Sequence, residues 1–420
     1  MWNRFIFFLN RVGERLWVRP LIACILSVAA AFVAKGADSL SAFKYIPAIN
    51  SESIETLLSI TASSMLVIAT LAVASMVSAY ASASSGATPR SFTVLVSDNI
   101  SQNALSTFLG TFIFTFVALI ALKNGFYGKN GLLALASMTA VILALVIITF
   151  LRWVDWIARL GRIGTTIKQV EAVGMDTFLK RRRCPRLGGA LTESASGPGQ
   201  AVYADTIGYV QHINVETLQS LAEEHMLQIS ICAIPGVFAT TDRPIAQVWP
   251  DDSSKSLPEL SCVAEAYEIG SDRTYDDDPR FALIALSEIA SKALSPAVND
   301  PGTAIGIFGS FIRLFSAWSK PLQEDEKVEV QFDRVHVPAL CAEDMLDDAF
   351  SATARDGASI VEVQIRLQKA LKSIAAMPDR ELTEAAKEQS RLAVKRAKMA
   401  INFEEDLALV TAAAEWSLQN

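Results

Sequence analysis

The chain has 420 residues and a net charge of -7; 51% of its residues are hydrophobic and 19% are charged. This composition is too apolar for a typical soluble protein, and the negative charge speaks against a nucleic-acid partner. The five cysteines include no CxxC pair. A disulfide framework, a metal site or a cofactor is therefore not predicted, and a reducing compartment is expected.

The first part of the chain contains four apolar stretches of about bilayer length. They lie at residues 16–34, 54–80, 104–122 and 131–151. Arg19 interrupts the first, but an arginine near a helix end can extend to the lipid headgroups. A cleaved signal peptide is the alternative for this stretch, although its basic region is long and no small-x-small cut follows. Residues 1–151 are predicted to form a domain of four transmembrane helices in the lipid bilayer.

Basic residues flank both ends of this predicted domain. They are Arg4, Arg11, Arg15 and Arg19 in the N-terminal segment, and Arg152, Arg159, Arg162 and Lys168 after the fourth stretch. Basic segments next to transmembrane helices stay on the cytoplasmic side, and an even number of spans returns the chain to the same side. Both termini are therefore predicted to be cytoplasmic.

The second apolar stretch is rich in hydroxyl side chains. At about 100° per residue, several of them fall on one side of a helix, opposite Leu, Ile, Val and Met. These are Thr56, Ser59, Ser63, Thr70 and Ser78. Small residues of this kind let two helices pack closely, and hydroxyls also line pores. The sequence leaves both interpretations open.

The third stretch begins with polar residues at helical spacing, Asn99, Asn103 and Ser106. They indicate either a helix contact or an inner pore mouth. None of the predicted spans carries an ionisable residue in its interior, and no GxxxxGK[ST] motif occurs. Coupled transporters and ATP-driven pumps need such groups, so passive conduction is the transport mode that the sequence favours.

The remaining chain is predicted to be a cytoplasmic α+β domain. We expect a juxtamembrane helix and linker at 152–200, a β-rich part with a small roll or barrel at 201–270, and a mostly helical bundle at 271–420. The run "KRRRCPR" in the first of these is interpreted as a solvated face or a contact with anionic lipid.

Two Asp-Pro pairs, at Asp278 and Asp300, each precede a helical pattern. Asp is a favoured N-cap and Pro suits the first helical position, so each pair predicts a helix start. Neighbouring polar residues exceed what capping needs. The candidate ligand-binding residues for an ion or small polar ligand are therefore Asp276, Asp277, Asp278, Asn299 and Asp300. Purely structural use is the alternative, and no catalytic residues are legible.

Several phrases together resemble a known family. They are "NALSTFLGTFIFTFVALIAL", "GYVQHIN", "PGVFATTDRPIAQV" and "DPRFALIALSEIASKALSPAVNDPGTA". They are similar to the bacterial predicted membrane proteins called "domain of unknown function 2254". The resemblance implies a multi-pass protein of the bacterial inner (plasma) membrane with a cytoplasmic C-terminal region. It assigns no activity and gives no residue a role.

The sequence thus predicts a homo-oligomeric passive channel for ions or small solutes, with a cytoplasmic domain that assembles and gates it. The alternative is a membrane-anchored cytoplasmic sensor or scaffold that binds a ligand or partner and does not conduct. An enzyme is the least favoured class, because no nucleophile–base pair is legible.

Overall fold

A computed structural model of the chain describes residues 17–39, 50–86, 88–96, 99–159, 162–191, 199–251, 260–322 and 330–418. The chain divides into two compact units, residues 1–166 and 167–420. Each unit is described by itself below.

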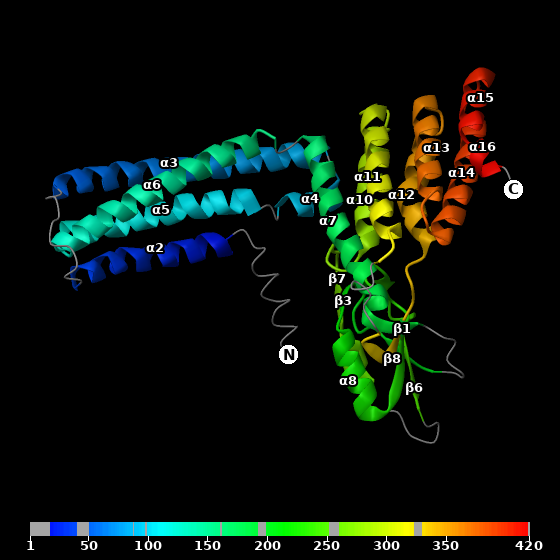
Figure 1. The fold of residues 1–420 in the computed structure, drawn as a ribbon, viewed down its shortest axis with the longest axis horizontal. Coiled ribbons are helices and arrows are strands. Elements are labelled where there is room, and N and C mark those ends of the chain that lie inside the picture. Colours follow the sequence, from blue (N-terminus) through cyan, green and yellow to red (C-terminus); the bar gives the residue numbers. More distant parts are fainter. Residues whose placement is uncertain are drawn as a thin grey trace. The chain divides into compact units, whose positions relative to one another are not determined.

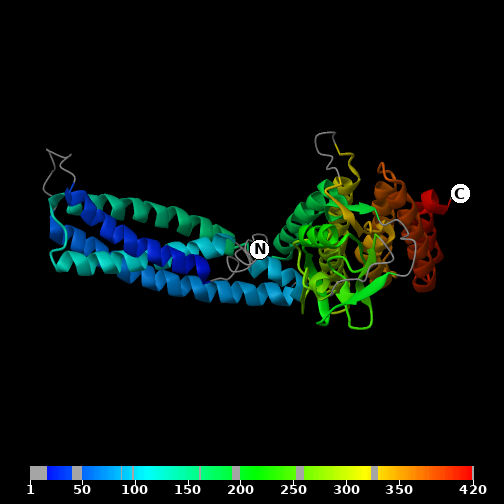
Figure 2. The ribbon, with the colours of Figure 1, turned by 90° about the horizontal axis from the view of Figure 1, so that it is seen from below.

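The first unit is a bundle of long apolar helices, which run side by side in both views (Figures 1 and 2). Its elements are α2 (Val18–Gly36), η1 (Ala37–Ser39), α3 (Ser51–Gly86), α4 (Pro89–Val96), α5 (Asn99–Lys123) and α6 (Lys129–Ile157). Helices α2, α3, α5 and α6 are long and apolar enough to cross a membrane. Helix α5 packs against the other three. The four expected apolar helices are therefore present.

Helices α2 and α5 approach closely because their contact residues are small. A side chain at Gly110 of α5 would lie 3.1 Å from Ser27 Oγ and 3.3 Å from the Cβ of Ala23, both on α2. Near the other end of α2, the Tyr127 hydroxyl donates to the Ala31 carbonyl at 2.9 Å. Small residues at helix contacts allow the van der Waals packing that holds helices together in lipid.

The carboxylate of Asp38 caps the start of α6 from a different part of the chain. It accepts hydrogen bonds from the backbone N–H of Gly128 and of Gly131, both at 2.7 Å. The residue in the N-cap position of α6 is Gly128, which has no side chain to do this. Asp38 thereby connects the end of α2 to the beginning of α6.

Replacing Asp38 with Ala is expected to lower the free energy of unfolding by about 1 to 2 kcal/mol, the usual cost of losing an N-cap. Thermal unfolding of the purified protein in detergent measures the change. Asp38→Asn keeps one acceptor oxygen and should lose less. Equal stability of Asp38→Ala and the wild type would contradict the capping role.

The second unit begins with a helix and continues into a mixed α/β region. Its elements to residue 270, with the last strand of the region, are α7 (Ile163–Arg183, whose first turn belongs to the first unit), η2 (Pro185–Gly188), β1 (Gly189–Leu191), β2 (Gln200–Tyr203), β3 (Gly208–Ile213), α8 (Val215–His225), β4 (Leu227–Ile231), β5 (Phe238–Ala239), β6 (Pro244–Pro250), α9 (Ser261–Ala264), β7 (Tyr267–Gly270) and β8 (Phe332–Val337).

The strands of the described chain form two sheets. One has the order β1-β8-β4-β6-β2, and the other β5-β3-β7. Strand β8 comes from the distant segment 332–337 and pairs in parallel with β1 and β4, whereas the other pairs are antiparallel. Both sheets have edge strands, so the closed barrel expected from the sequence is not confirmed.

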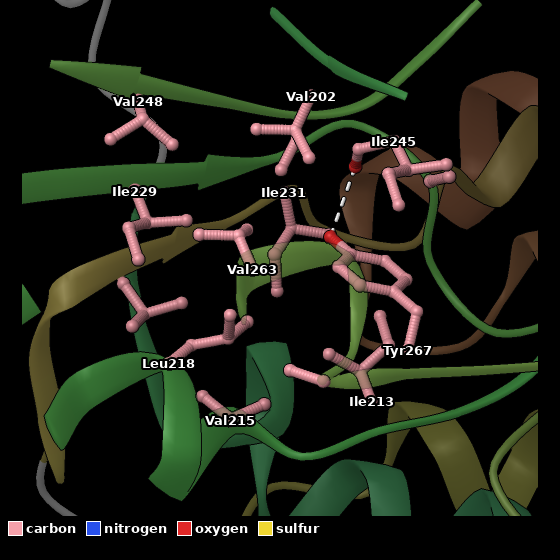
Figure 3. Close-up of a cluster of buried hydrophobic side chains, with 14 of the residues drawn as sticks. Val202, Ile213, Val215, Leu218, Ile229, Ile231, Ile245, Val248, Val263 and Tyr267 are labelled. Carbon is pink, nitrogen blue, oxygen red and sulfur yellow. Dashed lines mark hydrogen bonds between the residues drawn. The ribbon is translucent and has the colours of Figure 1, made fainter. Parts of the chain in front are cut away.

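A hydrophobic core fills the space between the sheets and α8 (Figure 3). Leu218 of α8 and Ile229 of β4 are fully buried in it. The Tyr267 side chain is also buried, and its hydroxyl donates to the Ile245 carbonyl at 3.0 Å. This bond satisfies the polar atom of an otherwise apolar cluster.

The rest of the second unit is helical, as expected. It consists of α10 (Pro279–Ala293), α11 (Pro301–Ser319), α12 (Ala342–Asp356), α13 (Val361–Ala375), α14 (Arg380–Ala400), α15 (Glu404–Ala413) and α16 (Glu415–Leu418). Phe308 and Phe311 of α11 pack on Phe350 of α12. The Arg280 guanidinium at the start of α10 pairs with Asp344 at 2.7 Å and Asp348 at 2.6 Å on α12.

Candidate functional site

The hydroxyl residues of α3 point away from the other helices of the bundle. Thr56, Ser59, Ser63, Thr70 and Ser78 are all exposed. The buried residues of α3 are Ile54, Leu58, Thr61, Ala62, Met65, Ala69, Ala72 and Met76. At about 100° per residue the two sets lie on opposite sides of the helix. Packing among the described helices of this unit therefore does not account for the hydroxyl face.

This outward face is chemically mixed. Three of its hydroxyls donate to the carbonyl four residues earlier: Thr56 to Glu52 at 2.9 Å, Ser63 to Ser59 at 2.9 Å and Thr70 to Leu66 at 2.8 Å. Exposed apolar side chains lie among them, for example Val67 and Val77. Hydroxyls bonded to their own backbone are satisfied in lipid, yet their oxygens remain available as acceptors.

Small side chains also leave a shallow hollow near the C-terminal end of α3. It measures 470 Å³ and is lined by Ala74, Ser75, Ser78, Ala79, Ser82 and Ile157. A surface indented by small residues suits close approach of another helix.

The polar residues of α5 lie elsewhere in the bundle. Asn103 accepts a hydrogen bond from Arg19 Nη1 of α2 at 3.2 Å. Ser106 is buried and donates to the Gln102 carbonyl at 2.7 Å. Both residues line a 440 Å³ groove between α2, α5 and α6. Asn99 begins α5, and its side chain lies outside the described residues. The structure thus does not bring Asn103 and Ser106 onto the outward face of α3.

In the second unit, the buried carboxylate of Asp277 is the centre of a hydrogen-bonded network. Only 7% of this residue is exposed. One carboxylate oxygen lies 2.5 Å from the Lys180 Nζ of α7, and the other lies 2.5 Å from the His212 Nδ1 of β3. Its backbone carbonyl accepts from Arg181 Nη2 at 2.7 Å. The network therefore joins α7, β3 and the start of α10.

Asp278 occupies the N-cap position of α10, but its side chain does not cap the helix. The carboxylate instead pairs with Arg273, at 2.6 Å from Nη2 and 2.7 Å from Nε. A Cβ at Gly236 would lie 2.3 Å from Asp278 Oδ2, so this glycine, which has φ +95°, leaves room for the pair. The helix start was predicted correctly, whereas a side-chain cap is absent.

The two neighbouring carboxylates have opposite pKa shifts. Burial raises the pKa of Asp277, but the hydrogen bonds from His212 and Lys180 outweigh it and bring the pKa down to about 2. Burial raises the pKa of Asp278 above its usual value, and the pairing with Arg273 offsets only part of this. The pKa of Asp277 therefore differs from that of Asp278 because two side chains, His212 and Lys180, hydrogen-bond to the Asp277 carboxylate.

The other candidate ligand residues are not gathered at this network. Asp276 is next to it in sequence but exposed. Asn299 is exposed and has φ +50°, and Asp300 caps α11 by accepting from the Thr303 N–H at 3.1 Å. Helix α10 has 15 residues and so separates the two groups by about 20 Å. The five residues do not form one site, and ligand binding by either group stays a prediction.

Sequence reasoning missed the partners in this network. Lys180 and Arg181 belong to the basic run that was interpreted as solvated or lipid-bound, yet Arg181 is only 5% exposed. His212 lies 65 residues before the aspartate that it contacts. The available signal was the pair Asp276 and Asp277 before the N-cap residue Asp278. A carboxylate that is not needed for capping requires a cationic partner if it is buried.

Four apolar helices followed by a mixed α/β and helical unit define this chain as a membrane protein with a large second unit. It belongs to the family described as "Predicted membrane protein (DUF2254)", whose model matches residues 13–373.

Similar curated proteins cover only part of the chain. An uncharacterized protein of Mycobacterium bovis and one of Mycobacterium tuberculosis strain H37Rv are each 31% identical over 118 residues. An uncharacterized protein of M. tuberculosis strain CDC 1551 is 30% identical over the same length. The match spans 27% of this chain and 22% of each relative. No solved structure matches.

Proposed function

We propose that the protein is a homo-oligomeric passive channel of the bacterial plasma membrane, with both termini on the cytoplasmic side. Copies of the chain associate through the outward side of α3. Thr56, Ser59, Ser63, Thr70 and Ser78 line the path that they enclose. The second unit, at the cytoplasmic side, assembles the subunits and controls opening.

The observation that carries this proposal is the exposed hydroxyl face of α3. Its residues lie opposite those that pack in the bundle, so packing among the described helices gives them no role. Lone-pair acceptors on a helix can replace part of the hydration of a passing ion. The hollow at Ser75, Ser78 and Ser82 supports close contact between copies at the end of the same helix.

Reconstituted liposomes test conduction directly. The full chain, with its five cysteines replaced by Ser, is expected to release a trapped ion or small solute. Ser63→Cys and Thr70→Cys variants should lose most of this flux after treatment with a charged thiol reagent, because the reagent places a charge in the narrow path.

Leu57→Cys is the matched control. Leu57 is also exposed on α3, but it lies about 100° around the helix from Thr56. Modification of this variant should leave the flux unchanged. No flux from the unmodified protein, or the same block in all three variants, would contradict the channel and leave the anchored sensor or scaffold as the better hypothesis.

A further inference from the structure

A pocket with three arginines lies in the second unit, between the C-terminal end of α7 and helices α11, α12 and α14. Its volume is 340 Å³, within the range of about 300 to 1,000 Å³ that small-molecule sites occupy. It is lined by Arg181, Pro185, Arg186, Trp318, Ala339, Leu340, Ala342, Met345, Asp379, Arg380 and Glu381. Residues from four segments distant in sequence thus meet around one cavity.

Two of the arginines have no partner among the described residues that could neutralise them. Neither Arg186 nor Arg380 makes a side-chain hydrogen bond or ion pair with the described part of the chain. The Arg186 Nε is buried, so it cannot be satisfied by bulk water either. An unpaired buried donor is costly, and an anion in the pocket would remove this cost.

The third arginine, Arg181, is held in position by a residue that does not line the pocket. Arg181 is 5% exposed and donates through Nη2 to the Asp277 carbonyl at 2.7 Å. The Asp277 network therefore fixes this guanidinium on one side of the pocket. A cation that is already positioned binds an anion at a smaller entropic cost.

The backbone that carries Arg186 is strained. Arg186 and Leu187 have φ values of 52° and 54°, and neither is a glycine. The left-handed region is unfavourable for both residue types, and two in succession are unusual. This backbone conformation places the Arg186 guanidinium at the pocket, at the point where the chain turns from α7 toward β1.

A helix start adds partial positive charge to the same pocket. Helix α12 begins at Ala342, which lines the pocket, and its N-cap residue Cys341 makes no side-chain capping bond. The carboxylate of Asp379, by contrast, is already used, because it caps α14 by accepting from the N–H groups of Glu381 and Leu382 at 3.0 and 3.1 Å. Three arginines and a helix N-terminus thus outnumber the two carboxylates of the lining, Asp379 and Glu381.

The remaining wall is apolar and contains a large aromatic ring. Trp318 of α11 lines the pocket with Leu340 and Met345. Its ring packs edge to face with that of Phe178 on α7, with centroids 5.8 Å apart, which holds the indole in position. Such a wall suits a flat ring, whereas inorganic phosphate would leave it unused.

We propose that this pocket binds a small organic phosphate with a flat ring, the chemistry of a mononucleotide. Arg181, Arg186 and Arg380 hold the phosphate, and the ring packs against Trp318. The site is independent of whether the membrane helices conduct.

Binding is measured by isothermal titration on the full chain in detergent, at low salt, with AMP, GMP, CMP and UMP as probes. We expect at least one of them to bind at least tenfold more tightly than both adenosine and inorganic phosphate, because only a nucleotide contacts both the arginines and Trp318. Added NaCl should weaken this binding, since it screens the arginines.

Three variants distinguish the arginines from the apolar wall of the pocket. Arg186→Gln with Arg380→Gln should weaken nucleotide binding at least tenfold, whereas Arg366→Gln, an exposed arginine of α13, should leave it unchanged. Trp318→Leu should weaken nucleotide binding but not pyrophosphate binding. Thermal unfolding with and without the nucleotide verifies that each variant is folded.

Three results would overturn the proposal. The first is that none of the four mononucleotides binds at millimolar concentration. The second is equal nucleotide affinity for the Arg186→Gln, Arg380→Gln double variant and the Arg366→Gln control. The third is phosphate binding as tight as that of the nucleotides, which would leave no role for Trp318.

Discussion

Replacing Asp277 with Ala is expected to lower the free energy of unfolding of the second unit by about 1.5 to 3 kcal/mol, the range for hydrogen bonds to a charged group. Its carboxylate contacts Lys180 Nζ and His212 Nδ1, both at 2.5 Å, and it is 7% exposed. The change leaves Arg181, which is 5% exposed, with less negative charge nearby. Thermal or denaturant unfolding of the full chain in detergent measures the loss.

Asp276 provides the matched control because it is adjacent but exposed. Asp276→Ala should change stability by about 0.5 kcal/mol or less, as for most surface substitutions. If the two variants lost the same amount, the buried network would not be a stabilising element.

The same carboxylate should give the second unit a specific acid sensitivity. The pKa of Asp277 is about 2 in the folded chain, below the ordinary value of 3.8 that an aspartate has in an unfolded chain. A depressed folded pKa contributes stability above the unfolded pKa, and this stability is lost as the pH falls from about 4 to about 2. The difference in unfolding free energy between wild type and Asp277→Asn should therefore shrink over this interval. A difference that stays constant from pH 5 to pH 2 would contradict the assignment.

Replacing Gly174 with Ala is expected to destabilise the second unit by about 2 to 3 kcal/mol, as overpacking of a close contact does. A Cβ at this position of α7 would lie 2.6 Å from the Cβ of Ala282 on α10. Neither atom belongs to a flexible side chain, so the two helices would have to separate. Unfolding of the full-length variant in detergent measures the cost.

Gly164 lies in the same helix and offers a control with the opposite sign. A Cβ at Gly164 would meet no atom of the described chain within 4 Å. Gly164→Ala should therefore not destabilise the protein. It should raise stability by less than the gain of about 1 kcal/mol that Ala has over Gly in a helix interior, because Gly164 lies in the first turn of α7. Destabilisation by both substitutions would show that the contact with Ala282 is not the cause.

Elements that depend on local chemistry could be predicted from the sequence. The four apolar helices follow from length and hydropathy, and the starts of α10 and α11 follow from Asp-Pro pairs. Asp300 caps α11 through its side chain as expected. Asp278 holds the same position before α10, but its side chain pairs with Arg273, because tertiary contacts outweighed the local capping preference.

Features that depend on distant segments could not be predicted in this way. Strand β8 joins β1 and β4 from more than 80 residues away, and no local pattern indicates a parallel partner. The basic run at the end of α7 has the composition of a solvated segment, yet Arg181 is buried against Asp277. Charge patterns show where cations lie along the chain but not which carboxylate will approach them.

The unequal lengths of α2 and α3 constrain the bilayer that the protein occupies. The 19 residues of α2 measure about 28 Å, close to the thickness of an ordinary hydrocarbon core, whereas the 32-residue apolar part of α3 measures about 48 Å. Tilting reduces the membrane thickness that a helix spans. Because α2 and α3 belong to one bundle, a tilt that fits α3 into the hydrocarbon core would also tilt α2, which would then no longer span that core. A bilayer matched to α2 therefore leaves part of the apolar surface of α3 beyond the acyl chains, where protein must cover it or headgroups must contact it.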